Sequence, residues 1–311
     1  MATVACLFPG QGSQRVGMGR DLAAAFPAAR QTFEEADDRL GTALTRLCFE
    51  GPEETLRLTE HAQPAILTAS VAAYRVLEAT AGLRPAAVCG HSLGEWSALV
   101  AAGVLTLGDA VVGVRERGRL MQAAVPNGVG AMAAVMGLEA DVVAALCREA
   151  AAGEVLAPAN LNGGGQVVVS GHAGAVARLV ALAEARRGRA QTLAVSAPFH
   201  CALMEPAAVG LARHLARVAF REPRVPVWTS VEARRVTGAA EIRDLLVRQV
   251  TAPVRWEETV RDVVAAVAPT AILEVGPGRV LAGLLRRIVP ELRALAAGDV
   301  DGIAKAREAL A

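Results

Sequence analysis

A serine flanked by glycines, in the segment 90–94 (GHSLG), is the strongest candidate for chemistry in this chain. The pattern G-x-S-x-G is typical of a sharp turn from a strand into a helix, where glycines relieve close backbone contacts. The helix that follows points its first N–H groups at the site and favours negative charge there. We therefore predict that Ser92 is a nucleophile and that the Leu93 amide binds an oxyanion. An ordinary turn with a serine cap is the alternative; the strand-turn-helix context favours the nucleophile.

A nucleophilic serine requires a general base. His200 lies in a proline-containing loop, residues 196–200, which follows a predicted strand and comes after Ser92 in the chain. The order serine then histidine is that of α/β-hydrolases. The side chain of His91 is expected to leave the serine turn in another direction. The other histidines fall near predicted helix ends or turns and are expected to be solvated: His61, His172 and His214. We favour His200 by elimination.

The elements that must position these residues follow an α/β pattern. Short apolar runs are separated by turns and by segments with helical spacing of apolar residues, which predicts a parallel sheet. We expect an α/β-hydrolase-like large domain. Its predicted strands are 4–8, 86–89 and 271–275, and its predicted helices include 21–40, 64–79, 95–102 and 109–125.

The middle of the chain has a different rhythm, with the order β-α-β-β-α-β. This order predicts a ferredoxin-like (split βαβ) arrangement, inserted into the larger domain. We expect a subdomain at 128–196 and a discontinuous catalytic domain at 1–127 and 197–311. The predicted elements are strands 131–136, 157–162, 166–170 and 190–195, with helices 141–151 and 173–187.

Composition restricts the classes of function. The 311 residues are 53% hydrophobic with a formal net charge of +1, which is far too apolar for a disordered chain and gives no basic field for nucleic acid. The five cysteines are dispersed, without C-x-x-C, so we expect neither a disulfide framework nor a metal site. No apolar run reaches the roughly 18 to 20 residues that span a bilayer. The amino terminus does not resemble a signal peptide. We expect a cytoplasmic protein that binds neither nucleic acid nor membrane.

Several segments together resemble the malonyl-CoA:acyl-carrier-protein transacylases. They occur in the family's order and at its spacing over the whole chain, which makes the resemblance much more specific than G-x-S-x-G alone. The matching segments are 8–14 (FPGQGSQ), 90–99 (GHSLGEWSAL), 117–122 (RGRLMQ), 160–162 (NLN) with 165–168 (GQVV), 198–204 (PFHCALM) and 249–256 (QVTAPVRW).

The resemblance implies the catalytic roles. Ser92 would carry the acyl group as an ester, and His200 would act as base and then as acid. Gln11 would join the Leu93 amide at the oxyanion. A carbonyl at Gln249 would replace the carboxylate of a triad and orient the imidazole. We hypothesise that the resulting less basic imidazole activates a thiol but activates water poorly.

The resemblance also implies the substrate-binding residues. Arg117 would pair with the free carboxylate of the malonyl group, although by sequence alone it would be a helix-surface residue. Phe199 predicts malonyl over methylmalonyl, because a bulky ring leaves no room for an α-methyl group. Asn162 would line the site from the small subdomain, and Met121 and His91 belong to the same matched segments.

The expected reaction is a ping-pong transfer of malonyl from malonyl-CoA to the phosphopantetheine thiol of an acyl carrier protein, for fatty acid or polyketide synthesis. No metal or prosthetic group is implied, because CoA enters as a substrate, and we expect a monomer. One alternative is a hydrolase that removes stalled acyl groups from carrier proteins; it would be expected to lack Arg117. The other is a non-catalytic docking module, which the set of Ser92, His200 and Gln11 disfavours.

Overall fold

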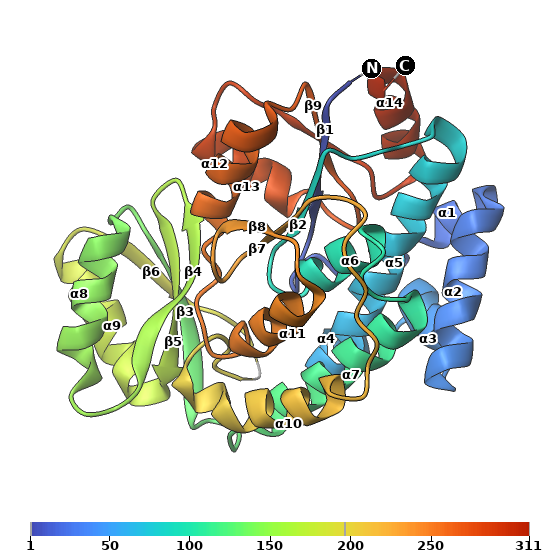
Figure 1. The fold of residues 1–311 in the computed structure, drawn as a ribbon. Coiled ribbons are helices and arrows are strands. Elements are labelled where there is room, and N and C mark those ends of the chain that lie inside the picture. The colour runs from blue at the N-terminus through green and yellow to red at the C-terminus, as the bar shows by residue number, and fades with distance from the viewer. Residues whose placement is uncertain (1, 196, 311) are drawn as a thin grey trace.

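The computed structural model describes residues 2–195 and 197–310. Ser196, the first residue of the loop expected to hold His200 and the expected end of the small subdomain, lies outside the described residues, as do the chain ends Met1 and Ala311. The elements form a large α/β unit with a smaller α/β unit at its side (Figure 1). The expected fold class is confirmed.

A six-stranded sheet forms the centre of the large unit, in the order β10-β9-β1-β2-β7-β8. The pairs from β10 to β7 are parallel, and β8 runs antiparallel to β7. The pairing of Phe8 with Gly90 places the end of β1 beside the turn that carries Ser92. The strands are β1 (Val4–Phe8), β2 (Ala87–Gly90), β7 (Val227–Thr229), β8 (Arg234–Val236), β9 (Ala271–Glu274) and β10 (Ala294–Ala296).

Helices cover both faces of this sheet, which explains why all five residues of β1 are apolar and buried. In β1, Cys6 and Phe8 belong to the larger hydrophobic cluster, with α5, α6 and α7, while Ala5 and Leu7 belong to a second cluster with α12 and α13. The helices of the large unit are α1 (Arg20–Ala25), α2 (Pro27–Leu40), α3 (Leu44–Glu50), α4 (Glu53–Arg57), α5 (Thr59–Ala81), α6 (Gly94–Ala101), α7 (Leu107–Ala123), the short 3₁₀ helix η1 (Ala202–Met204), α10 (Glu205–Leu215), α11 (Ala239–Arg248), α12 (Trp256–Val267), α13 (Val280–Ile288) and α14 (Val300–Leu310).

Two predicted helices differ from the observed ones. The segment 21–40 is two helices, because Phe26 is extended (φ −128°, ψ 123°) and Pro27 begins α2. Proline disfavours the helical conformation in the preceding residue and has no N–H to continue a helix. The second difference is at α5, which begins at Thr59, before the expected start at Pro64, and contains that proline in its interior.

The small unit has the predicted β-α-β-β-α-β order and its own hydrophobic core. Its antiparallel sheet has the order β4-β5-β3-β6, with β3 and β5 at the centre, as in the ferredoxin-like arrangement. Its elements are β3 (Gly130–Met136), α8 (Ala140–Ala151), β4 (Leu156–Gly163), β5 (Gln166–His172), α9 (Ala173–Ala185) and β6 (Arg189–Thr192). Figure 1 shows this unit, in green and yellow, beside the large sheet.

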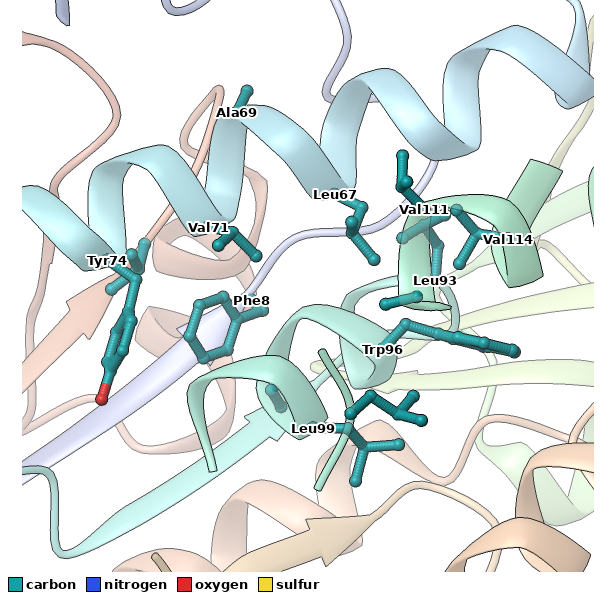
Figure 2. Close-up of a cluster of buried hydrophobic side chains, with 14 of the residues drawn as sticks. Phe8, Leu67, Ala69, Val71, Tyr74, Leu93, Trp96, Leu99, Val111 and Val114 are labelled. Atoms are coloured by element: carbon teal, nitrogen blue, oxygen red, sulfur yellow. The ribbon is translucent and has the colours of Figure 1, made fainter. Parts of the chain in front are cut away.

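A buried cluster holds α6 rigidly over β1. Figure 2 shows Leu67 and Val71 of α5 pointing toward Phe8 and the α6 side chains. Trp96 and Leu99 of α6 are fully buried in the same cluster. Because α6 begins directly after Ser92, this packing fixes the helix end that faces the serine. Within the described ranges, no helix is long and apolar enough to cross a membrane.

Candidate active site

Ser92 lies in a strained turn between β2 and α6. Its φ is +50°, a left-handed conformation that residues other than glycine rarely adopt. A Cβ added at Gly90 would lie 2.0 Å from the carbonyl carbon of Gly94, and one at Gly94 would lie 2.0 Å from the carbonyl oxygen of Phe8. Both glycines are therefore required by contact, and the turn holds the serine at the carboxyl end of the sheet.

Ser92 and His200 form a hydrogen-bonded pair. Ser92 Oγ lies 2.7 Å from His200 Nε2, and His200 Nδ1 lies 2.8 Å from the main-chain carbonyl oxygen of Gln249. A carbonyl oxygen only accepts hydrogen bonds, so Nδ1 carries the proton and Nε2 presents its lone pair to the serine hydroxyl. This is the tautomer that a general base for Ser92 requires.

Burial keeps His200 neutral. It lowers the pKa of the imidazole to about 3, and the nearby positive charge of Arg117 acts in the same direction. The hydrogen bond to the Gln249 carbonyl opposes this shift only in part. A neutral imidazole at ordinary pH is able to take the serine proton.

Arg117 of α7 is buried, with 2% of its surface exposed. Its Nη2 donates to Ser92 Oγ at 3.1 Å and to Gln249 Oε1 at 3.0 Å. Nη1 donates to Gln63 Oε1 at 2.8 Å. Burial lowers its pKa to about 10, and Glu95 opposes that shift, so the guanidinium stays charged at neutral pH. Among the described residues, no carboxylate forms a hydrogen bond or ion pair with it; its direct acceptors are neutral oxygens.

A cavity of about 800 Å³ opens over these side chains. Its lining contains eight of the residues that sequence reasoning placed in the site: Gln11, His91, Ser92, Leu93, Arg117, Met121, Phe199 and His200. Residues without an assigned role complete the lining: Gly12, Gln14, Arg57, Leu58, Gln63, Met132, Asn160, Leu193, Ala194 and Val195. The cavity therefore lies between the two units, since Met132, Asn160 and Leu193 come from the small one.

Asn160 is among the residues that line the cavity, whereas Asn162 forms a hydrogen bond with the lining residue His91. Asn162 Oδ1 lies 2.8 Å from His91 Nε2. The His91 ring also packs against Trp256, with centroids 5.4 Å apart. These contacts hold His91 in the cavity wall, away from the Ser92 hydroxyl, and its burial lowers its pKa.

The two residues expected to bind an oxyanion, Gln11 and Leu93, both line the cavity. The Leu93 amide stands at the start of α6, where helix N–H groups have no partner within the helix. Gln11 lies in the cavity wall, with its Nε2 donating to Thr59 Oγ1 at 3.2 Å. The expected donors are thus one main-chain N–H and one side-chain amide on the wall of the same cavity.

Gln249 contacts His200 through its main chain and Arg117 through its side chain. Its Nε2 donates to Glu95 Oε2 at 2.8 Å. The Glu95 carboxylate, fully buried in α6, also accepts from the Ser230 amide at 3.0 Å and from Ser230 Oγ at 2.9 Å. Sequence reasoning gave no role to Glu95 or to Gln63. Glu95 lies in a matched segment, whereas Gln63 gave no signal, because only the packing of α5 on α7 brings it to the guanidinium.

The remaining histidines are not all solvated. His172 Nδ1 accepts a hydrogen bond from the Val155 amide at 2.9 Å, and His214 Nε2 is buried without a partner. The part of the chain that the structure describes contains no group of three or more His, Cys, Asp or Glu side chains placed to hold a metal ion. The five cysteines are free and buried.

The chain matches one family model, "Acyl transferase domain", over residues 6–305. It is also similar to the malonyl CoA-acyl carrier protein transacylase of Escherichia coli strain K12. The two are 50% identical over 309 residues, which cover 99% of this chain and 100% of the relative.

Solved structures show the same fold. The malonyl CoA-acyl carrier protein transacylase of Coxiella burnetii superposes with a TM-score of 0.97 at 41% identity, covering 99% of this chain and 98% of the other. A malonyl-transacylase solved in complex with a holo type II PKS acyl-carrier protein gives a TM-score of 0.96 at 47% identity, with 99% of each chain covered.

Proposed function

The chain belongs to the acyl transferase domain family, and from that premise we propose that it transfers the malonyl group of malonyl-CoA to the phosphopantetheine thiol of an acyl carrier protein. The relatives described above are named for this reaction. The pathway served is fatty acid or polyketide synthesis.

One observation carries the proposal. A buried guanidinium donates to the hydroxyl of an activated serine, with Arg117 Nη2 3.1 Å from Ser92 Oγ and Ser92 Oγ 2.7 Å from His200 Nε2. An acyl group on Ser92 therefore has a buried cation within a few ångströms. The free carboxylate of a malonyl group matches that cation and its planar donors.

The proposed mechanism is ping-pong. In the first half-reaction, Ser92 Oγ attacks the thioester carbonyl and its proton passes to His200 Nε2. The Leu93 amide and Gln11 stabilise the oxyanion of the tetrahedral intermediate. The C–S bond then breaks, and the CoA sulfur leaves with the proton from the imidazole, which leaves malonyl esterified to the serine.

The second half-reaction reverses these roles. His200 takes the proton of the phosphopantetheine thiol, whose sulfur attacks the serine ester. The same oxyanion donors stabilise the second tetrahedral intermediate. The C–O bond breaks, Ser92 Oγ recovers the proton, and the carrier protein leaves with the malonyl thioester. Bond types are exchanged one for one, so no redox partner or metal takes part in any step.

Substrate choice follows from two sides of the cavity. An acetyl group would leave the buried guanidinium without a carboxylate partner, so Arg117 selects for malonyl. The Phe199 ring, 8% exposed, lines the same cavity and leaves little room for an α-methyl group. Met121 and His91 complete the wall around the acyl chain.

The remaining expectations belong to the same proposal. Residues 128–196 would form the small subdomain and 1–127 with 197–311 the catalytic domain, which the separate hydrophobic core of the small unit supports. The protein would be a cytoplasmic monomer that needs no cofactor. Its partners would be malonyl-CoA and an acyl carrier protein, without nucleic acid or membrane.

The test is the intact mass of the protein after brief incubation with equimolar acetyl-, malonyl- and methylmalonyl-CoA. The Ser92→Ala variant is run in parallel. We expect a single malonyl adduct that is lost in the variant and that transfers to a holo carrier protein. An acetyl or mixed adduct would contradict the roles of Arg117 and Phe199. Steady release of CoA without an adduct would instead indicate a hydrolase.

A further inference from the structure

Glu95 is a fully buried carboxylate that the mechanism above leaves unused. It lies one turn after Ser92 in α6. Its Oε2 accepts three hydrogen bonds, two from Ser230 and one from Gln249 Nε2 at 2.8 Å. Its Oε1 is buried without a hydrogen-bond partner among the described residues, and burial raises the pKa of the group, so keeping a carboxyl group here costs stability.

The contacts of Glu95 fix the direction of a neighbouring amide. Glu95 Oε2 accepts from the Ser230 amide and hydroxyl, so it is an acceptor here and Gln249 turns its NH₂ toward it. Its Oε1 then faces Arg117 Nη2, which donates to it at 3.0 Å. The opposite amide orientation would place the Gln249 NH₂ against the Arg117 guanidinium, with donor facing donor, and its oxygen against the Glu95 oxygen.

We propose that Glu95 is a positioning residue: it orients the Gln249 amide, and this amide holds the Arg117 guanidinium beside Ser92. In that place the guanidinium selects an acyl group that has a free carboxylate. This inference deepens the proposed function and rests on it. Arg117 has no carboxylate hydrogen-bonded to it among the described residues, so its direction depends on neutral oxygens such as Gln249 Oε1 and Gln63 Oε1.

These contacts predict that loss of Glu95 affects the selectivity for malonyl over acetyl more than the reactivity of Ser92. His200 is held by the main-chain carbonyl of Gln249, which remains when the side-chain amide rotates. Arg117 is held by the side-chain oxygen of Gln249, and this contact is lost when the amide rotates. Loss of Glu95 should therefore weaken use of malonyl-CoA while acetyl transfer, which needs no carboxylate contact, changes little.

Two substitutions separate the hydrogen bond from the charge. Glu95→Met has similar length but no acceptor, so Gln249 Nε2 loses its shortest hydrogen bond. It keeps only the longer contacts to the Ser92 carbonyl oxygen, at 3.3 Å, and to Ser230 Oγ, at 3.5 Å. Glu95→Gln removes the charge and keeps an oxygen, which the Ser230 amide holds toward Ser230 and Gln249. We expect Glu95→Met to lower the malonyl-to-acetyl ratio of kcat/KM about tenfold or more, chiefly through the KM for malonyl-CoA. We expect Glu95→Gln to stay within about threefold of wild type.

Ser230→Ala is the matched control. It removes the hydrogen bond of the Ser230 hydroxyl to the same carboxylate and the long contact of 3.5 Å from Gln249 Nε2 to Ser230 Oγ. The shorter contact between Gln249 Nε2 and Glu95 Oε2, at 2.8 Å, remains. We expect a lower Tm with an unchanged malonyl-to-acetyl ratio. If Glu95→Met lowers only the Tm in the same way, or if Glu95→Gln loses as much selectivity as Glu95→Met, positioning through the hydrogen bond is wrong.

A further variant covers the case in which Glu95→Met does not fold. Gln249→Met keeps the main-chain carbonyl and removes the amide through which Glu95 acts. It must also lose malonyl selectivity, and a wild-type ratio there would overturn the proposal. A wild-type enzyme without preference for malonyl would overturn the proposed function itself, whereas a wild-type preference that survives in Glu95→Met overturns only the role of Glu95.

Discussion

His200 Nδ1 donates to the main-chain carbonyl of Gln249 at 2.8 Å, so the group that orients the imidazole is part of the backbone. The Gln249 side chain lies between Arg117 and Glu95. A substitution of that side chain, such as Gln249→Glu, therefore places the new group beside Arg117 and leaves the partner of His200 unchanged.

We predict that Gln249→Glu leaves the hydrolysis of the malonyl-enzyme unchanged and weakens its formation. The new carboxylate would pair with Arg117 and compete with the malonyl carboxylate, lowering kcat/KM for malonyl-CoA about tenfold or more. Single-turnover acylation and decay of the adduct, followed by intact mass, measure both. A faster decay would restore the hypothesis that a more basic imidazole activates water. Gln249→Met serves as the control without charge.

Arg117→Met should weaken the preference for malonyl over acetyl. Removing the guanidinium removes the partner of the malonyl carboxylate, and an apolar side chain of similar length fills the space. We predict that the malonyl-to-acetyl ratio of kcat/KM falls at least about 100-fold. The competition experiment with equimolar CoA esters measures this directly. A malonyl adduct that still dominates in Arg117→Met would assign the carboxylate to another residue.

The pH profile should report the burial of His200. Only the neutral imidazole accepts the serine proton, and the lowered pKa of about 3 keeps it neutral far below the ordinary value near 6.5. We predict that acylation of Ser92 by p-nitrophenyl acetate, a probe without a carboxylate, is retained at pH 5. Since the positive charge of Arg117 is the second cause of the shift, Arg117→Met should move the acid limb to higher pH. An acid limb near pH 6.5 in the wild type would contradict a buried neutral base.

The free energy of unfolding should also depend on pH through His200. The unfolded chain binds a proton at His200 near pH 6.5, while the folded protein resists it until about pH 3. The contribution of His200 to the free energy of unfolding is therefore present above pH 6.5 and is lost as the pH falls toward 3. Denaturant titrations of the wild type and of His200→Gln should diverge less at pH 4 than at pH 7. An equal difference at the two pH values would show that His200 is not buried neutral.

The sequence predicted those features that depend on local pattern. β1, β2 and β9 are apolar at successive positions because both faces of their sheet are covered. The nucleophile turn was predictable because it has a short local pattern, in which a Cβ at Gly90 would clash with the Gly94 backbone; the clash that excludes a Cβ at Gly94 is with the distant Phe8. The break of the first long helix was also encoded, since Pro27 follows an extended Phe26.

Features that depend on distant contacts could not be read in the same way. The burial of Arg117 requires Gln63 and Gln249 as acceptors, and these lie 54 and 132 residues away. No local pattern distinguishes such an arginine from a solvated one. In β4, register shifts lie between Pro158 and Asn160 and between Leu161 and Gly163. They interrupt the alternation of side chains, so spacing did not tell which of the two asparagines faces the cavity.

Gly94 in the nucleophile turn has a matched control in Gly283, a glycine of α13. Gly94→Ala would place a Cβ 2.0 Å from the Phe8 carbonyl oxygen, whereas Gly283→Ala in α13 meets nothing within 4 Å. We predict that the first loses more than about 3 kcal/mol of stability or fails to fold, and that the second gains about 0.5 to 1 kcal/mol. Tm measurements of both variants test this. A folded, active Gly94→Ala would show that the turn tolerates a wider backbone.

Phe199 should decide between malonyl and methylmalonyl. Its ring lines the cavity beside His200, and a substrate with an α-methyl group needs the space that the ring occupies. We predict that Phe199→Ala raises the methylmalonyl-to-malonyl ratio of kcat/KM about tenfold or more, because one methyl group in a tight pocket discriminates by about that factor. Phe220→Ala controls for the loss of a ring elsewhere, since Phe220 packs under Arg243. An unchanged ratio in Phe199→Ala would place the steric limit on another residue of the cavity wall.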